Sequence, residues 1–305
     1  MKYLHIYSFI SLLFVSTAVA SAIRTITVDG LQREFHIYQP QNINTPVPLL
    51  MVFHGGGGNA EKMRDVSQFD VIAGREKFIV VYAQSHKGHW NDGRKSTSDG
   101  VNDIAYVNAI ISLLVDNEEV DKSSVFATGI SNGGFFTQRL ACESSSFKAY
   151  ASVVATMGLS LYQSCKPSNA INILMINGRE DTFVPWGGGE VKKGWFRGKG
   201  GKIVSVDKMM AFWRSHNQCE RQRRMQLENK DTQDNTLVTQ VSYNSCRDGV
   251  TLQQLDIEGG GHIWPGYPLK FFGRRLLGNS SMDIDASEEI WGFFENTKGL
   301  SKSGD

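Results

Sequence analysis

The sequence lacks the marks of several protein classes. Its 32 lysines and arginines almost balance 31 acidic residues, so the formal net charge is only +1. A chain without a long basic block offers no continuous surface to a phosphate backbone, and we expect no nucleic-acid partner. The sequence also contains no internal repeat and no low-complexity linker. Its 305 residues therefore suit one large α/β domain.

Long apolar runs are missing beyond the first 20 residues. Lys2 precedes an apolar run near residues 6–15, and the small residues at 18–22 follow it. A short apolar run with an A-x-A cleavage site is typical of a secretory signal peptide rather than of a membrane span. We predict a signal peptide at 1–20, cleaved after Ala20 or Ala22. The mature domain, 21–305, would then be secreted or periplasmic, with no membrane span.

Cysteine is scarce, because the chain has four: Cys142, Cys165, Cys219 and Cys246. None forms a C-x-x-C pair, so a zinc site is a poor interpretation, and we expect no metal and no other cofactor. An even number of cysteines in an exported chain predicts two disulfides. Four cysteines permit three pairings, of which proximity along the chain favours Cys142–Cys165 and Cys219–Cys246.

Short apolar runs alternate with helix candidates along the mature chain. Residues 23–28 and 33–38 flank Asp29-Gly30, which predicts a hairpin. The later runs lack polar alternation, as expected of strands covered on both faces. They span 48–53, 78–82, 125–128, 149–154 and 171–176, and the helix candidates lie near 60–74, 104–114, 132–142, 206–216 and 286–296. This βαβ pattern predicts one α/β domain, with a mostly parallel central sheet and helices on both faces.

Residues 129–133 read Gly-Ile-Ser-Asn-Gly and match the G-x-S-x-G pattern. In that pattern a sharp turn between a strand and a helix exposes the serine hydroxyl, and side chains at the flanking glycines would clash. The pattern alone is weak, but the predicted strand at 125–128 and helix at 132–142 supply the required context. We therefore predict that Ser131 is a nucleophile. The alternative is a glycine-rich turn with an inert serine.

A serine hydroxyl needs an adjacent base, and that base needs a group to orient it. His262 follows Gly259-Gly260-Gly261, just after the apolar segment 250–257, and is the predicted base. Asp181 follows the apolar run 171–176 and is the predicted acid, with Glu180 as the second choice. The chain order Ser, Asp, His is the one that α/β-hydrolases use.

Bare backbone follows the run 48–53, where the sequence reads His54-Gly55-Gly56-Gly57-Gly58. Such a loop can present amides to the negative oxygen of a tetrahedral intermediate. We expect the oxyanion donors to be the amides of Gly56 and Asn132. The loop lacks the Lys-Ser/Thr ending of a phosphate loop. His86 and His89, with Asp92 nearby, have ligand-like spacing. However, a loop at the mouth of the site, with Trp90 as an aromatic contact, is the better interpretation.

Taken together, these motifs resemble those of esterases related to polyhydroxybutyrate depolymerases and feruloyl esterases. The resemblance extends from Phe35 to about Phe294 and includes Trp90-Asn91, Asp103 and the run Gly261-His262-Ile263-Trp264-Pro265-Gly266. It implies an α/β-hydrolase fold and a triad of Ser131, Asp181 and His262. It also implies the disulfide Cys219–Cys246 and a substrate pocket with Trp264 as one wall.

The sequence thus predicts a secreted serine carboxylesterase that works through an acyl-enzyme. Its expected partner is a small-molecule or oligomeric ester. Hydroxyalkanoate oligomers, feruloylated or acetylated saccharides and short-chain esters all fit the same machinery. Two alternatives stay open: a serine peptidase with the same triad, and a non-catalytic binding protein on the same scaffold.

Overall fold

The computed structural model describes residues 20–97, 100–193, 198–269 and 271–298. The predicted signal peptide lies outside this part of the chain, apart from Ala20, so its cleavage stays a prediction. None of the helices in the described ranges is both long enough and apolar enough to cross a membrane.

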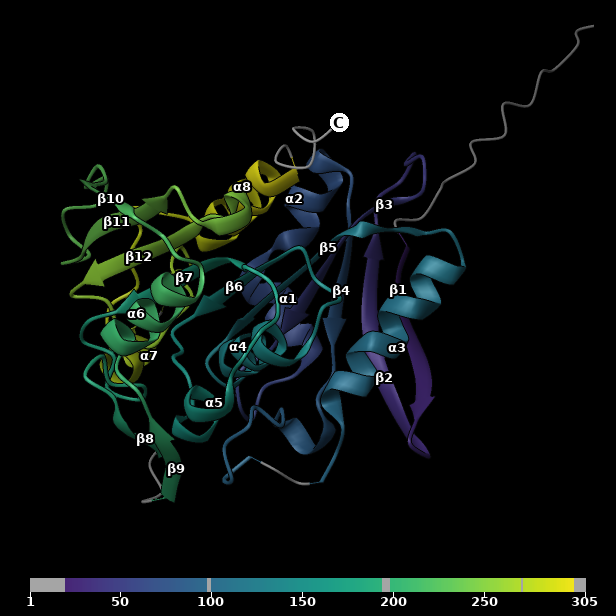
Figure 1. The fold of residues 1–305 in the computed structure, drawn as a ribbon, viewed down its shortest axis with the longest axis horizontal. Helices are drawn as coiled ribbons and strands as arrows, with labels where there is room; N and C mark the ends of the chain where they lie inside the picture. Colours follow the sequence, from purple (N-terminus) through teal and green to yellow (C-terminus); the bar gives the residue numbers. More distant parts are fainter. Residues whose placement is uncertain (1–19, 98–99, 194–197, 270, 299–305) are drawn as a thin grey trace, which may run out of the picture.

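A ten-stranded sheet forms the centre of the described structure (Figure 1). Its strands are β1 Ala20–Val28, β2 Leu31–Gln39, β3 Val47–Phe53, β4 Ile79–Ala83, β5 Val120–Ile130, β6 Ala149–Val153, β7 Asn172–Gly178, β10 Arg221–Gln226, β11 Leu237–Asn244 and β12 Leu252–Glu258. Their order is β1-β2-β4-β3-β5-β6-β7-β12-β11-β10. Adjacent strands from β4 to β12 pair in parallel. Strands β1 and β2 at one edge, and β11 and β10 at the other, pair antiparallel with their neighbours. The mostly parallel sheet confirms the predicted fold class.

Helices cover both faces of this sheet, as the unbroken apolar runs predicted. Leu49, Met51 and Phe53 of β3 point into one core, and Leu50 and Val52 point into the other. The first core is closed by α3 Asp103–Asp116, α4 Asn132–Glu143, α5 Leu159–Ser164 and α6 Val206–His216. The second is closed by α1 Ala60–Ser67, α2 Phe69–Glu76 and α8 Ala286–Lys298, and α7 Phe271–Leu277 follows the loop that carries His262.

The structure departs from the sequence-based elements in several places. The single helix expected at 60–74 is two helices, because Gln68 adopts a left-handed conformation (φ 52°) that ends α1. Several elements were not predicted at all: strands β10 and β11, helices α5 and α7, and the separate hairpin of β8 (Gly189–Lys193) and β9 (Gly198–Ile203). All six residues of β10 are exposed, so this strand carries no apolar pattern to reveal it.

Two disulfides join segments on the α4 and α6 side of the sheet. Cys142, in α4, is bonded to Cys165, directly after α5. Cys219, shortly after α6, is bonded to Cys246, just beyond β11. These are the two pairs that proximity along the chain favoured.

Candidate active site

The predicted site residues meet at one edge of the sheet. Strands β3, β5, β7 and β12 are parallel, so the loops that follow them leave the sheet at the same edge. These loops carry Gly55 to Gly58, Ser131, Asp181 and His262 respectively. Topology therefore brings together residues that lie as far apart in sequence as 55 and 262.

Ser131 occupies a strained turn between β5 and α4. Its backbone has φ 54° and ψ −118°, a conformation that non-glycine residues rarely adopt. The Ser131 amide donates to the carbonyl of Val153 (2.9 Å), and its carbonyl accepts from the amide of Phe135 (2.8 Å). A Cβ on Gly133 would lie 2.2 Å from the carbonyl oxygen of Phe53. The tight approach of α4 to β3 thus requires glycine at 133, as the G-x-S-x-G pattern predicted.

His262 lies between the serine and the acid. Its Nε2 is 2.9 Å from the hydroxyl of Ser131, and its Nδ1 is 2.7 Å from Oδ2 of Asp181. An ionised carboxylate only accepts hydrogen bonds, so the neutral ring carries its proton on Nδ1 and offers the Nε2 lone pair to the serine hydroxyl. The three side chains therefore form a continuous relay with the polarity that removes a proton from Ser131.

The carboxylate of Asp181 is fixed by its own loop. Its Oδ1 accepts from the amides of Phe183 and Val184, both at 2.8 Å, and this leaves Oδ2 for His262. The residue is only 6% exposed. The ring of Phe183 stacks on the imidazole of His262 with centroids 5.2 Å apart. These backbone and aromatic contacts fix the positions of Asp181 and His262 relative to each other.

Close backbone contacts at two glycines fix the loop that carries His262, one against the end of β7 and one against the end of α7. A Cβ on Gly178 would lie 2.3 Å from the carbonyl oxygen of Gly260, and a Cβ on Gly261 would lie 2.0 Å from that of Leu277. The amide of His262 donates to this same Leu277 carbonyl, at 2.6 Å. Side chains at these glycines would push His262 away from Asp181.

The two expected oxyanion donors lie beside Ser131. A Cβ on Gly55 would be 3.5 Å from Cβ of Ser131, and one on Gly56 would be 3.5 Å from Cβ of Asn132. Asn132 is the first residue of α4, and the first amides of a helix have no acceptor within the helix. Gly56 and Asn132 thus lie next to each other beside Ser131, and their role as oxyanion donors stays a proposal.

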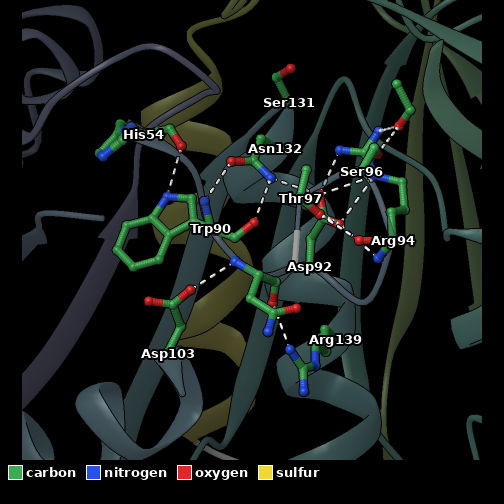
Figure 2. Close-up of polar contacts among 12 residues, drawn as sticks. His54, Trp90, Asp92, Arg94, Ser96, Thr97, Asp103, Ser131, Asn132 and Arg139 are labelled. Atoms are coloured by element: carbon green, nitrogen blue, oxygen red, sulfur yellow. Dashed lines mark hydrogen bonds and ion pairs between the residues drawn. The ribbon is translucent and has the colours of Figure 1, made fainter. Parts of the chain in front are cut away.

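The side chain of Asn132 is anchored by a buried network that the sequence analysis missed (Figure 2). Its Oδ1 accepts from the amide of Trp90 (2.8 Å), and its Nδ2 donates to the Trp90 carbonyl (3.1 Å) and to Oδ2 of Asp92 (2.6 Å). Asp92 in turn forms an ion pair with Arg94, which also donates to the carbonyl of Gly200 (2.9 Å). The network therefore ties the residue after the nucleophile to hairpin β8–β9.

The structure corrects the prediction that Trp90 and Trp264 contact substrate. Trp90 is 0% exposed and donates from Nε1 to the carbonyl of His54 (3.0 Å), while its ring stacks on Phe136. Trp264 is 1% exposed and donates to the hydroxyl of Ser287 (3.1 Å). An indole can be buried when its N–H finds an internal acceptor, and both do. The two rings support the loops of the site from within the core.

Burial of Asp92 predicts a large stability effect. Its side chain is 0% exposed and that of Arg94 is 6% exposed, so Asp92→Asn leaves a buried guanidinium without its counter-charge. Removing one partner of a buried pair costs about 3–5 kcal/mol of unfolding free energy. The matched control is Glu288→Gln, in the exposed pair with Arg75, where solvent screens the charges and we expect a much smaller loss. Urea denaturation of both variants tests this, and equal losses would contradict it.

His54 makes stability depend on pH. Burial, which disfavours the charged ring, lowers the pKa of His54 from 6.5 to about 4. Its Nε2 accepts from the amide of Ser85 (3.2 Å), a contact that protonation would abolish. The unfolded chain therefore binds more protons than the native one between about pH 6.5 and pH 4. The contribution is complete above that range and is lost as the pH falls through it.

We expect His54→Gln to remove this part of the pH dependence. Between pH 7 and pH 5 the wild-type protein should lose about 2 kcal/mol of unfolding free energy through His54, at about 1.4 kcal/mol per pKa unit. The variant lacks this loss. The free-energy advantage of the wild-type protein over the variant should therefore be about 2 kcal/mol smaller at pH 5 than at pH 7. His86→Gln, in the loop that follows β4, is the control. If that advantage were the same at pH 7 and pH 5, His54 would not be the source of this pH dependence.

Comparisons with known proteins agree with this geometry. Residues 34–184 match the family model described as esterase PHB depolymerase. A predicted esterase, NocK, of Nocardia uniformis subsp. tsuyamanensis is 27% identical over 83% of this chain and 76% of that protein. The bifunctional acetylxylan esterase/xylanase XynS20E of Neocallimastix patriciarum is 23% identical over 76% of this chain, which spans only 31% of that longer enzyme.

A solved structure shares the fold. The acetyl xylan esterase from Aspergillus awamori aligns with a TM-score of 0.58 and 14% identity, and covers 92% of this chain and 100% of its own. Sequence relatives and fold thus lead to the same group of proteins. The chain therefore resembles the PHB depolymerase-related esterases, whose family model it matches over residues 34–184, and it has the α/β-hydrolase fold.

Proposed function

We propose that this chain is a serine carboxylesterase that hydrolyses its substrate through an acyl-enzyme. The observation that carries the proposal is the hydrogen-bonded relay from Ser131 through His262 to Asp181, with distances of 2.9 and 2.7 Å. The strained backbone of Ser131 supports the same role, because nucleophile turns of this fold share it. Contacts of this length let one residue activate the next without rearrangement.

In the first half of the reaction, Nε2 of His262 takes the hydroxyl proton as Ser131 Oγ bonds to the ester carbonyl carbon. The carbonyl oxygen becomes an oxyanion, which the amides of Gly56 and Asn132 would stabilise. Asp181 stabilises the imidazolium. When the carbon–oxygen bond to the alcohol breaks, His262 returns the proton to the leaving alkoxide. The acyl group stays on Ser131.

In the second half, water takes the place of the alcohol. His262 removes a proton from the water as it attacks the acyl carbon, and the same amides hold the second oxyanion. Collapse breaks the bond to Ser131, and the proton on His262 goes to the serine oxygen. The products are the carboxylic acid and the regenerated enzyme, so the residues named above account for every proton transferred.

Esters of saccharides, hydroxyalkanoate oligomers and short-chain alcohols are the proposed substrates. The relatives named as acetylxylan esterases support the saccharide class. We further propose that the protein is secreted or periplasmic after cleavage of residues 1–20. Its two disulfides support this location, because such bonds persist in oxidising compartments.

The test compares an ester with an amide that carries the same acyl group. Purified protein is assayed on p-nitrophenyl butyrate and on the p-nitroanilide of butyric acid. An esterase cleaves the ester with a kcat/KM far above that for the anilide. Comparable cleavage of both would favour a peptidase, and no cleavage of either would favour a non-catalytic binding protein.

A further inference from the structure

An exposed histidine that the proposed mechanism does not use lies beside the glycine loop. The Cδ2–Nε2 edge of the His89 ring faces Gly56, because a Cβ on Gly56 would be 3.3 Å from both ring atoms. The same built atom would be 3.5 Å from Cβ of Asn132. His89 therefore borders the two residues whose amides are the proposed oxyanion donors.

The backbone on each side of His89 is fixed to these same elements. Before it, the carbonyl of Gly88 accepts from the amide of Gly57 at 2.8 Å. After it, the amide and the carbonyl of Trp90 both bond to the side chain of Asn132, as Figure 2 shows. A side chain held between two such anchors loses little backbone freedom when it meets a ligand. The position of His89 is thus set by the oxyanion site itself.

The hydrogen bonds of the ring decide what His89 can offer. Its Nδ1 lies 3.4 Å from the carbonyl of Lys87, and a carbonyl can only accept. The neutral ring therefore carries its proton on Nδ1 and a lone pair on Nε2. Among the described residues, none donates a hydrogen bond to this Nε2. An electron-rich nitrogen would repel an oxyanion, but it can accept from a hydroxyl group.

We propose that His89 is a specificity-determining residue that accepts a hydrogen bond from a substrate hydroxyl next to the scissile ester. This inference rests on the proposed function, since an ester bound at Ser131 is what would bring a hydroxyl to this place. The hydroxyl has two sources: the alcohol side, as in esters of sugars and other polyols, or the acyl side, as in hydroxyacyl esters. In both cases Nε2 of His89 would accept a hydrogen bond from a hydroxyl group.

Two matched substrate pairs separate these sources. Glycerol monoacetate against propyl acetate differs in hydroxyls on the alcohol side, and ethyl 3-hydroxybutyrate against ethyl butyrate differs by one hydroxyl on the acyl side. The ratio of kcat/KM within each pair is measured for the wild-type protein, His89→Ala and His89→Phe. A net hydrogen bond between neutral groups contributes about 0.5–1.5 kcal/mol, so the ratio of one pair should fall roughly 3–10-fold in both variants.

His86→Ala is the matched control, because it removes a ring from the same loop, three residues away, and should leave both ratios as in the wild type. A fall in the alcohol-side ratio assigns His89 to polyol esters, and a fall in the acyl-side ratio assigns it to hydroxyacyl esters. Unchanged ratios in both His89 variants, with the esters still hydrolysed, would overturn the proposal. If the wild-type protein hydrolyses neither p-nitrophenyl butyrate nor any of the four esters, the proposed function fails and the inference falls with it. Hydrolysis of p-nitrophenyl butyrate but of none of the four esters would overturn the inference alone.

Discussion

Replacing Ser131 with alanine is expected to lower kcat for p-nitrophenyl butyrate by about 10⁶-fold, the typical loss when the nucleophile of such a relay is removed. The hydroxyl lies 2.9 Å from Nε2 of His262, and no other group would form the acyl-enzyme. Alanine removes one oxygen from a partly buried site, so the fold should survive. The residual rate would reflect binding and oxyanion stabilisation alone.

The control for Ser131→Ala is Ser123→Ala, on the exposed part of β5. Both variants should unfold at nearly the wild-type temperature in a thermal melt. Activity should disappear in the first variant and persist in the second. A folded Ser131→Ala protein that kept even one tenth of the wild-type kcat would exclude Ser131 as the nucleophile.

The second large effect is expected from Asp181→Asn, which should lower kcat by about 10⁴-fold. The reason lies in the loop, where the amides of Phe183 and Val184 both donate to one carboxylate oxygen. An asparagine would place its oxygen there and turn its NH₂ group toward Nδ1 of His262. The ring would then carry its proton on Nε2 and could not accept one from Ser131.

Glu180→Gln is the matched control for this change, because Glu180 is the adjacent carboxylate and is exposed. We expect kcat within about twofold of the wild-type value, as for surface changes away from the chemistry. Steady-state kinetics of the two variants side by side decide between the carboxylates. A greater loss in Glu180→Gln than in Asp181→Asn would reverse the assignment.

Sequence patterns predicted most of the fold and the spatial grouping of the candidate site residues, because the signals for both are local. Ser131, Asp181 and His262 each follow a short buried apolar run, and parallel strands place such positions at one edge. The glycines around them mark close backbone contacts, such as that of Gly133 with Phe53. Both the apolar runs and the glycines can be recognised in the sequence without knowledge of long-range contacts.

The parts that sequence could not supply depend on contacts between distant segments. The anchoring of Asn132 needs Asp92, and the charge of Asp92 needs Arg94, which reaches Gly200 in hairpin β8–β9. No pattern in the sequence links Asp92 to Asn132, or Arg94 to Gly200. The error at Trp90 and Trp264 has the same origin, because an aromatic residue near a site can face the ligand or the core, and only packing decides.

The most direct test of the proposed mechanism is to locate the covalent adduct. The protein is treated with a fluorophosphonate, and digested peptides are examined by mass spectrometry while residual esterase activity is followed. We expect one equivalent of phosphonate on Ser131, with activity falling in proportion, and no adduct in Ser131→Ala. An adduct on another residue, or full inactivation without modification of Ser131, would contradict it.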